Sequence, residues 1–537
     1  MSYLENAADF EFNQTPFHLG FLPTEQSSSL TRNLDKEFAK SVPGGVRYLQ
    51  QVDRNVLTMA GKIFASEEFA QLCDEITKAI SGGYRVIFSG CGATGRLSIL
   101  LETMWRQGVP EYADSVQSIM TGGDYALVKS VESFEDYAVF GARQVRDMQM
   151  VPGDLLVAIT EGGETSSVLG TVKEFTSYGG KAFLLFNNPA ELLKKHLDRC
   201  REAIENPSVT VLDLSCGPMA LAGSTRMQAT TSEQLIASAA LEIAAGRIFN
   251  NGRKYDFAAG FKRVLEVLES DAAVEKMADE INFEAEIYRN NGKVTYFADE
   301  YMLDLFTDTT ERSPTFMLPG FKRIDDKSLP EPWAFLQNPL YPAKEAMKRA
   351  LGDREVRCLQ WAKPDYLAMN APEKIVNDPP QISAENLAKI PVGNEELPGR
   401  YDSGKDAAVL FYYGKVDKKL RNTAENRGEK FAFYREFDGS CGKLPPSRLK
   451  IFEHLAVKLF WNTISTGTMV CMGRVAGNWM SCVAISNKKL IDRAIRLISE
   501  LGKVDYHTAC MELFRTVELN NGGPAVLQTL ERIGRKY

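Results

Sequence analysis

The sequence lacks the features that several classes of protein require. It has no excess of basic residues, because 63 Lys and Arg stand against 70 Asp and Glu and give a net charge of −7. This balance argues against nucleic acid as the main partner. No uninterrupted apolar run reaches about 18 residues, so we expect no membrane-spanning segment. The N-terminus has no signal-peptide pattern.

Metal-binding motifs are missing as well. The nine cysteines show no C-x-x-C or other metal spacing and the four histidines are scattered, so no metal site is expected. Cys91, Cys471 and Cys482 lie in apolar surroundings, as buried free thiols do. We therefore expect a reducing, cytoplasmic compartment.

One stretch of the chain does carry a chemical signal, a glycine-rich loop behind a short apolar run. Residues 86–88 predict a strand, residues 90–96 (G-C-G-A-T-G-R) a turn, and the apolar pattern from Leu97 a helix. Such a turn directs backbone N–H groups and a positive helix end at an anion. The loop also fits the dinucleotide fingerprint G-x-G-x-x-G. It therefore indicates a sugar phosphate or a nucleotide, with a plain tight turn as the alternative.

A second polar loop, T-E-G-G-E-T at residues 160–165, follows another predicted strand. Loops at the carboxyl ends of parallel strands converge, so two anion-binding loops would share one site. A dinucleotide site does not need the second loop, and it wants an acid after the second strand, where only Asp124 is available. We therefore favour a sugar phosphate and expect no cofactor, while an ordinary Gly/Ser turn remains the alternative.

Other candidate residues have plainer readings beside the functional ones. Ser224 and Thr225 precede a predicted helix and are first of all N-cap residues, although a helix start can also bind an anion. Glu135 lies in a charged run that is usually a solvated helix face. Glu311 opens an unusual acid–Pro–aromatic turn, E-R-S-P-T-F. Lys458 lies in an apolar helix, where it could reach the surface or a phosphate.

Strands that alternate with helices predict parallel sheets covered on both faces. With 537 residues the chain is too long for one core, and the pattern starts twice, which indicates two similar α/β halves and a small helical tail. Expected strands are 86–88, 116–120, 155–159, 182–186, 209–214, 294–298, 356–361, 408–412 and 430–434. Expected helices include 52–80, 130–140, 227–248, 255–288, 301–310, 450–465 and 489–501. Residues 1–45 and 364–398 are expected to be irregular.

With these residues in view, the chain resembles the sugar isomerase (SIS) domain superfamily, in the branch of N-acetylmuramic acid 6-phosphate etherases and the glucokinase regulatory protein. G-C-G-A-T-G-R-L resembles the branch's G-x-G-T-S-G-R loop, and L-A-G-S-T-R-M-Q-A its longer T-G-S-T-R-M-K-A signature. Near the C-terminus, N-T-I-S-T-G-T-M-V-C-M-G-R-V-A-G-N-W-M and I-S-N-K-K-L-I-D-R-A are also similar.

The resemblance implies two flavodoxin-like three-layer αβα domains in one chain, a pseudo-dimer. The expected ranges are an arm at 1–45, SIS domains at 46–255 and 256–487, and a helical tail at 488–537. The two family glutamates fall in different halves, on Glu135 and Glu311, and the second half's phosphate loop is degraded to A-D-E-Y at residues 298–301. One composite site is therefore implied. Its expected binding residues are Gly92, Ala93, Thr94, Gly95, Arg96, Thr160, Gly162, Gly163, Thr165, Ser224, Thr225, Arg226 and Lys458.

The function implied is the binding of a hexose or amino-sugar 6-phosphate, as a sensor or as an enzyme. An etherase-like carbon–oxygen lyase would use Glu135 and Glu311 as an acid/base pair. A ligand-dependent regulator of a sugar kinase is the alternative from another class, because the regulatory protein of this branch binds a sugar phosphate without turnover. An aldose–ketose isomerase is a weaker alternative, since T-E-G-G-E-T is nearer the S-x-S-G-E-T loop of SIS isomerases than the etherase A-S-G-R-T loop.

Overall fold

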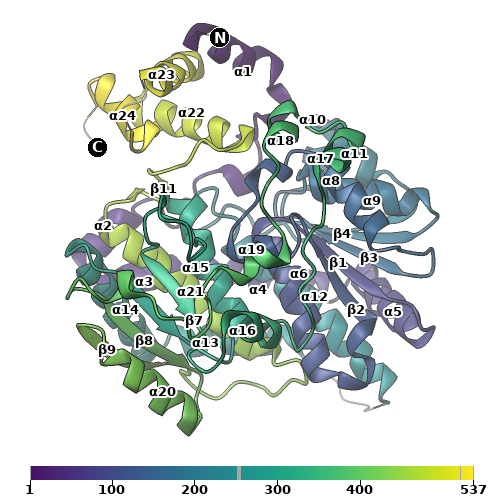
Figure 1. The fold of residues 1–537 in the computed structure, drawn as a ribbon. Coiled ribbons are helices and arrows are strands. Elements are labelled where there is room, and N and C mark those ends of the chain that lie inside the picture. The colour runs from purple at the N-terminus through teal and green to yellow at the C-terminus, as the bar shows by residue number, and fades with distance from the viewer. Residues whose placement is uncertain (1, 251–254, 520–521, 536–537) are drawn as a thin grey trace.

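The computed structural model describes residues 2–250, 255–519 and 522–535. Residues 251–254, where the two expected domains meet, lie outside the described residues. Two separate parallel sheets are present, and long helices lie between them (Figure 1). The predicted α/β class with parallel sheets is thus confirmed. We call the part that carries β1–β5 the first half and the part that carries β6–β9 the second half.

The first sheet has five parallel strands in the order β2-β1-β3-β4-β5. This is the flavodoxin-like order, in which a ligand crevice forms at the carboxyl ends of β1 and β3. The strands are β1 Val86–Gly90, β2 Val116–Met120, β3 Leu155–Ile159, β4 Lys181–Phe186 and β5 Val209–Asp213. The helices of this half are α4 Asp53–Ile63, α5 Glu67–Ser81, α6 Gly92–Gly108, α7 Tyr125–Val128, α8 Ala138–Asp147, α9 Ser166–Ser177, α10 Ala190–His196, α11 Asp198–Ile204 and α12 Gln228–Ile248.

The second sheet has four parallel strands in the order β7-β6-β8-β9. It repeats the first four positions of the first sheet, so the expected similarity of the halves is present in the topology. The strands are β6 Val294–Phe297, β7 Ala334–Gln337, β8 Ala407–Tyr412 and β9 Phe433–Asp438. The helices are α13 Phe257–Leu268, α14 Asp271–Arg289, α15 Met302–Phe316, α16 Ala343–Ala350, α17 Lys363–Ala368, α18 Glu373–Asn377, α19 Ala384–Ala388, α20 Lys418–Gly428 and α21 Ile451–Cys471.

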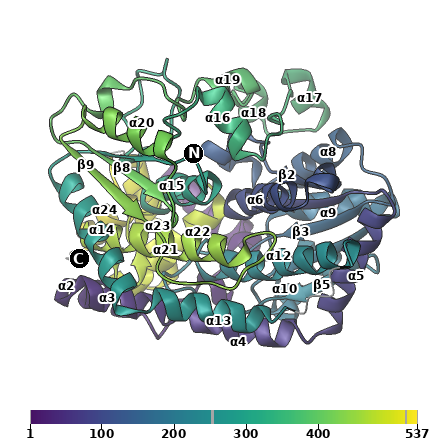
Figure 2. The ribbon, with the colours of Figure 1, turned by 90° about the horizontal axis from the view of Figure 1, so that it is seen from below.

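The halves share a core. Helix α12 contacts α21, and α6 contacts α15, so each half sends two helices to the common centre (Figure 2). Helices α12 and α21 are buried almost all round, as expected of helices that are covered on every side. One hydrophobic cluster runs from β1 through these helices to β6. The carboxyl ends of β1 and β3 therefore open toward residues of the second half.

The chain ends form a helical cap beside the two sheets (Figure 1). Helix α1 Tyr3–Asn13 packs on α23 Tyr506–Leu519, and α22 Lys488–Gly502 packs on α23 and on α24 Ala525–Arg532. The helical character of the tail was predicted, and α22, α23 and α24 confirm it. The irregular arm was a wrong prediction, because Ser2 and Glu5 form a capping box that starts α1. Helices α2 Leu34–Lys40 and α3 Val42–Gln50 follow, and β10 Val475–Ala476 and β11 Trp479–Met480 form a small hairpin.

Three predicted helices differ from the structure. The helix expected at 52–80 is broken where Ser66 caps α5, and the one at 255–288 is broken where Ser270 caps α14. A serine cap ends the preceding helix because its oxygen takes the N–H groups of a new first turn. The helix expected at 130–140 is a loop with a short 3₁₀ turn before α8. The Glu135 carbonyl accepts from the Ser167 N–H at 3.0 Å, a contact that an α-helix would prevent.

The second sheet also departs from prediction. The expected strand at 356–361 does not form. Instead the backbone of Arg357 pairs with Asp124, behind β2 of the first half. The strand that completes the sheet, β7, has four residues and was not predicted, and β9 begins three residues later than expected. The tract 364–398 contains the short helices α17–α19 rather than being irregular. No helix among those described is long and apolar enough to cross a membrane.

Candidate functional site

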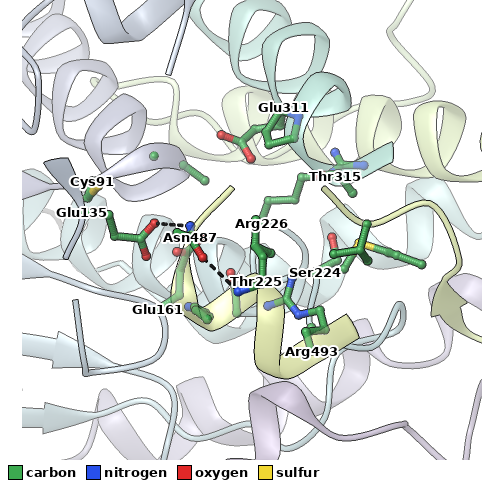
Figure 3. Close-up of a pocket in the computed structure, with 18 of the residues that line it drawn as sticks. Cys91, Glu135, Glu161, Ser224, Thr225, Arg226, Glu311, Thr315, Asn487 and Arg493 are labelled. Atoms are coloured by element: carbon green, nitrogen blue, oxygen red, sulfur yellow. Dashed lines mark hydrogen bonds between the residues drawn. The ribbon is translucent and has the colours of Figure 1, made fainter. Parts of the chain in front are cut away.

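A cavity lies at the carboxyl edge of the first sheet, against α15 of the second half (Figure 3). Seven segments supply its walls: the loop after β1, the loop before α8, the loop after β3, the segment before α12, helix α15, the end of β11 with the residues after it, and the start of α22. Its polar lining residues are Cys91, Glu135, Glu161, Thr165, Ser224, Thr225, Arg226, Glu311, Thr315, Asn487, Lys489 and Arg493. The cavity therefore combines both predicted loops and both predicted glutamates.

The glycine-rich loop presents the start of α6 to the cavity. Gly92 is the first residue of α6, has φ +55°, and a side chain there would meet open space. Gly92 and Ala93 line the cavity, so the positive end of a 17-residue helix faces it. The Thr94 hydroxyl is engaged within the turn, because it donates to the Cys91 carbonyl at 2.9 Å and accepts from the Cys91 N–H. Thr94 therefore shapes the loop and does not line the cavity.

Two other residues of that loop also lie behind the cavity. Gly95 packs against β2 and Gly90, where a Cβ would come within 2.7 Å of Met120. Arg96 is fully buried and forms an ion pair with Glu311 of α15. Its remaining N–H groups donate to the carbonyls of Ala126 and Leu127 and to a serine hydroxyl. Arg96 thus holds Glu311 in place from behind.

The loop after β3 contributes through Thr165 and Glu161. Thr160 donates its hydroxyl to Thr165 at 3.0 Å, so Thr160 orients Thr165 and does not itself line the cavity. Gly162 and Gly163 form the turn: the Gly162 carbonyl accepts from Asn188, and Gly163 has φ +81°. Glycine is needed at that φ.

The segment before α12 supplies hydroxyls and a guanidinium. Helix α12 begins at Gln228 and no side chain caps it, so the N-cap interpretation of Ser224 and Thr225 is wrong. Ser224 is buried and lines the cavity, and within the described part of the chain its hydroxyl has no hydrogen-bond partner. Arg226 is held by Asp308 at 3.1 Å and by Asn462, both of the second half. A buried hydroxyl without a partner points to a ligand.

Lys458 neither reaches the surface nor lines the cavity. Its ammonium donates to the carbonyls of Arg226 and Met227, at 2.9 and 3.1 Å, and to the Thr231 hydroxyl at 2.7 Å. Burial lowers the pKa of Lys458 to about 7. Lys458 therefore supports the Ser224–Arg226 segment from the second half.

The cavity contains three carboxylates. Glu135 accepts from the Asn487 amide at 3.4 Å, and Figure 3 shows it at the left of the view, with Glu311 at the top. Glu161, which was not singled out from the sequence, accepts from the Thr230 hydroxyl at 2.9 Å. Burial raises the pKa of Glu161 to about 7, although Lys489 opposes the shift. Near neutral pH this side chain can both donate and accept a proton.

Two cations were missed because they come from the far end of the chain. Lys489 and Arg493 lie one turn apart on α22, in the segment I-S-N-K-K-L-I-D-R-A. Lys489 pairs with Glu164 at 2.7 Å, and Arg493 pairs with Glu25 of the N-terminal arm. Their i, i+4 spacing was the available signal, because such residues share a helix face. Among the described residues no group of His, Cys, Asp and Glu could hold a metal ion.

Comparisons with known proteins agree with this architecture. Residues 68–176 match the family model described as the glucokinase regulatory protein N-terminal SIS domain. An N-acetylmuramic acid 6-phosphate etherase of Rippkaea orientalis is 30% identical over 237 residues, which cover 43% of this chain and 72% of that relative. A second such etherase, from Bacillus licheniformis, is 27% identical and 73% covered.

Similar solved structures include a tagatose-6-phosphate ketose/aldose isomerase from Escherichia coli. It is 10% identical with a TM-score of 0.42, over 84% of this chain and 96% of that chain. The etherase relatives, rather than this likeness, show the family. The chain belongs to the sugar isomerase (SIS) domain superfamily, in the branch that contains the N-acetylmuramic acid 6-phosphate etherases and the glucokinase regulatory protein.

Proposed function

We propose that this protein binds a hexose or amino-sugar 6-phosphate in the cavity between its two halves. The observation that carries the proposal is the buried hydroxyl of Ser224, which lacks a partner among the described residues and lines a cavity that the start of α6 also faces. In this proposal the halves are two SIS domains, 46–255 and 256–487, that act as a pseudo-dimer with one complete site.

The phosphate would lie at the start of α6. The exposed backbone of Gly92 and Ala93 and the helix dipole favour an anion there. The hydroxyls of Ser224, Thr225 and Thr165 would donate to phosphate or sugar oxygens. The cations Lys489 and Arg493 add positive charge on the side of α22.

The sugar would lie among the carboxylates. Glu135, Glu161 and Glu311 line the same cavity, and carboxylates accept hydrogen bonds from sugar hydroxyls or from an amine. The Glu311 carboxylate is fixed by Arg96, so it would accept from the ligand without first having to be ordered.

A thermal-shift panel of hexose and amino-sugar phosphates, with the unphosphorylated sugars as controls, tests the proposal. A ligand that binds the folded state raises the melting temperature in proportion to the logarithm of its concentration over its Kd. We expect at least one 6-phosphate to stabilise the wild-type protein more than its Ser224→Ala variant, whereas the parent sugar should shift both alike. No shift with any phosphate would contradict the proposal.

A lyase activity is the second candidate, because the relatives are N-acetylmuramic acid 6-phosphate etherases and both predicted glutamates line the cavity. In this case Glu135 and Glu311 would be the acid/base pair, and Glu161 offers a third titratable group. Release of lactate from N-acetylmuramic acid 6-phosphate, lost in Glu311→Gln, would support it. Absence of lactate at high protein concentration, with the substrate shown to bind, would leave binding as the function.

A regulatory role is the third candidate, favoured by the match to the glucokinase regulatory protein domain. The partner would be a sugar kinase, recognised only in one ligand state. A pull-down of a purified sugar kinase with and without sugar phosphate tests this; equal or no capture in both conditions would count against it. We also propose a reducing, cytoplasmic compartment, because Cys73, Cys200, Cys216 and Cys510 are buried thiols rather than disulfides.

A further inference from the structure

A second cavity lies at the carboxyl edge of the second sheet, away from the site described above. It has a volume of about 300 Å³ and is lined by the loop after β6 and by parts of α6, α15, α16 and α21. Its polar lining includes Thr103, Asp299, Glu300, Tyr301, Asp304 and Asp353. It is the counterpart of the first cavity, because α15 follows β6 as α6 follows β1, and each cavity is closed by the other half's helix.

The backbone at the two helix starts is alike but the side chains differ. Gly92 begins α6 with φ +55°, and Tyr301 precedes α15 with φ +57°. A Cβ at Gly92 would meet open space, whereas Tyr301 places a ring at the corresponding point and donates its hydroxyl to Glu453. The open cradle that suits a phosphate in the first half is thus filled in the second.

The charge of the second cavity also opposes a phosphate. Four carboxylates line it, those of Asp299, Glu300, Asp304 and Asp353, against the two cations Arg349 and Lys450. The Lys450 ammonium lies 5.7 Å from the centre of the Tyr301 ring and makes a cation–π contact with it. A surplus of fixed negative charge favours a cationic ligand.

Two buried polar atoms in this cavity, Oγ1 of Thr103 and Oδ1 of Asp304, have no hydrogen-bond partner among the residues that the structure describes. Thr103 is 5% exposed and Asp304 4%, and both line the cavity. The other Asp304 oxygen is 2.8 Å from Nδ1 of His454, so the carboxylate is fixed with one oxygen left over. Because buried polar atoms are normally paired, these two atoms point to a ligand that carries hydrogen-bond donors.

We propose that this second cavity binds a small hydroxylated molecule with a protonated amine and no phosphate, of which an unphosphorylated amino sugar is the simplest. Its ammonium donates to Asp304 Oδ1 among the carboxylates, and a hydroxyl pairs with Thr103. The cavity, the two unpartnered atoms and the charge carry this inference, which does not depend on what the first cavity binds.

Titration calorimetry with glucosamine, glucose and glucosamine 6-phosphate tests the proposal. We expect glucosamine to bind, and glucose, which lacks the ammonium, to bind at least about tenfold more weakly. Thr103→Val keeps the side-chain shape and should weaken glucosamine binding about fivefold, and Asp304→Asn about tenfold or more. Ser224→Ala, in the first cavity, is the matched control and should leave glucosamine affinity unchanged.

No glucosamine binding by the wild-type protein at about 50 mM, beyond the roughly millimolar Kd of a weak small-molecule site, would overturn the proposal. So would binding that Thr103→Val and Asp304→Asn both leave intact, provided melting curves show both variants folded. Equal affinity for glucose would overturn the requirement for an amine. Loss of glucosamine binding in Ser224→Ala alone would assign the ligand to the first cavity instead.

Discussion

The guanidinium of Arg96, on α6 of the first half, is paired with the carboxylate of Glu311, on α15 of the second half. Arg96 is fully buried and the Glu311 side chain is 13% exposed, at the wall of the cavity. The helix that begins at the glycine-rich loop therefore positions the carboxylate that faces the loop. Arg96, which was expected to bind phosphate, and Glu311, which was expected to transfer a proton, are thus joined to each other by an ion pair.

Removal of either member of this pair should destabilise the protein. Removing one member of a buried ion pair typically costs about 3–5 kcal/mol, because the other charge is left without its partner. We expect Arg96→Ala to lower the free energy of unfolding by that amount in urea titrations. The double variant with Glu311→Ala should recover part of the loss. The pair Arg421–Glu436, whose side chains are 45% and 32% exposed, is the control and should show a coupling below about 1 kcal/mol. Additive effects of Arg96→Ala and Glu311→Ala would contradict the coupling.

Ser224 allows binding to be separated from stability. Because its hydroxyl has no partner in residues 2–250, 255–519 and 522–535, Ser224→Ala should leave the free energy of unfolding nearly unchanged and weaken sugar-phosphate binding about five- to tenfold. Ser118 is the matched control: it is also buried, but its hydroxyl donates to Glu102 at 2.6 Å. Ser118→Ala should lose about 1.5–3 kcal/mol of stability and keep its affinity. If calorimetry and urea unfolding show instead that Ser224→Ala loses stability and keeps its affinity, Ser224 does not belong to the binding site.

Glu161 should make stability depend on pH. Its pKa is about 7 in the folded protein against the ordinary value of 4.5, so between these pH values the folded state holds a proton that the unfolded state has lost. The stabilisation is complete below pH 4.5 and is lost as pH rises through 7, about 3 kcal/mol in all. Relative to wild type, Glu161→Gln should therefore become more stable as pH increases from 4.5 to 7. Glu286→Gln, exposed on α14, is the control. If the difference in stability between Glu161→Gln and wild type does not change with pH, the pKa of Glu161 is not raised in the folded protein.

Glu25 should act in the opposite direction. Burial alone would raise its pKa, but the guanidinium groups of Arg493 and Arg496 outweigh burial and lower it to about 2. The stabilisation is present above pH 4.5 and is lost as pH falls from 4.5 toward 2, about 3 kcal/mol in all. Glu25→Gln should be less stable than wild type at pH 7 and nearly equal at pH 2.5. Since Arg493 lines the cavity, this variant should also weaken sugar-phosphate binding. If the difference in stability between Glu25→Gln and wild type is constant across this pH range, the ion pairs of Glu25 are not its cause.

Much of the fold could be predicted because parallel strands buried on both faces read as continuous apolar runs. The strand 155–159 matches β3 at both ends, and 116–120 matches β2. The prediction failed where local pattern and tertiary contact disagree. Residues 356–361 have strand character, yet their backbone pairs with Asp124 in the first half. Residues 334–337 form a four-residue strand that was not predicted.

The site was predicted in part. Gly92, Ser224, Glu135 and Glu311 line one cavity, as the composite arrangement requires. Lys458 lies behind that cavity, because its buried ammonium is used on backbone carbonyls. That use depends on the approach of α21 to α12, which no spacing along the chain reveals.

The sequence alone determined the α/β class, the two similar halves and the loops at the strand ends, because each follows from local apolar periodicity and turn chemistry. Only the tertiary structure decided which polar groups share a cavity. Lys489 and Arg493 enter the first site because the C-terminal helix is held by Glu25 near the other end of the chain. Thr103 and Asp304 meet in the second because α6 and α15 pack together. These contacts depend on the packing of helices from distant segments of the chain. That packing determines which cavity each side chain faces.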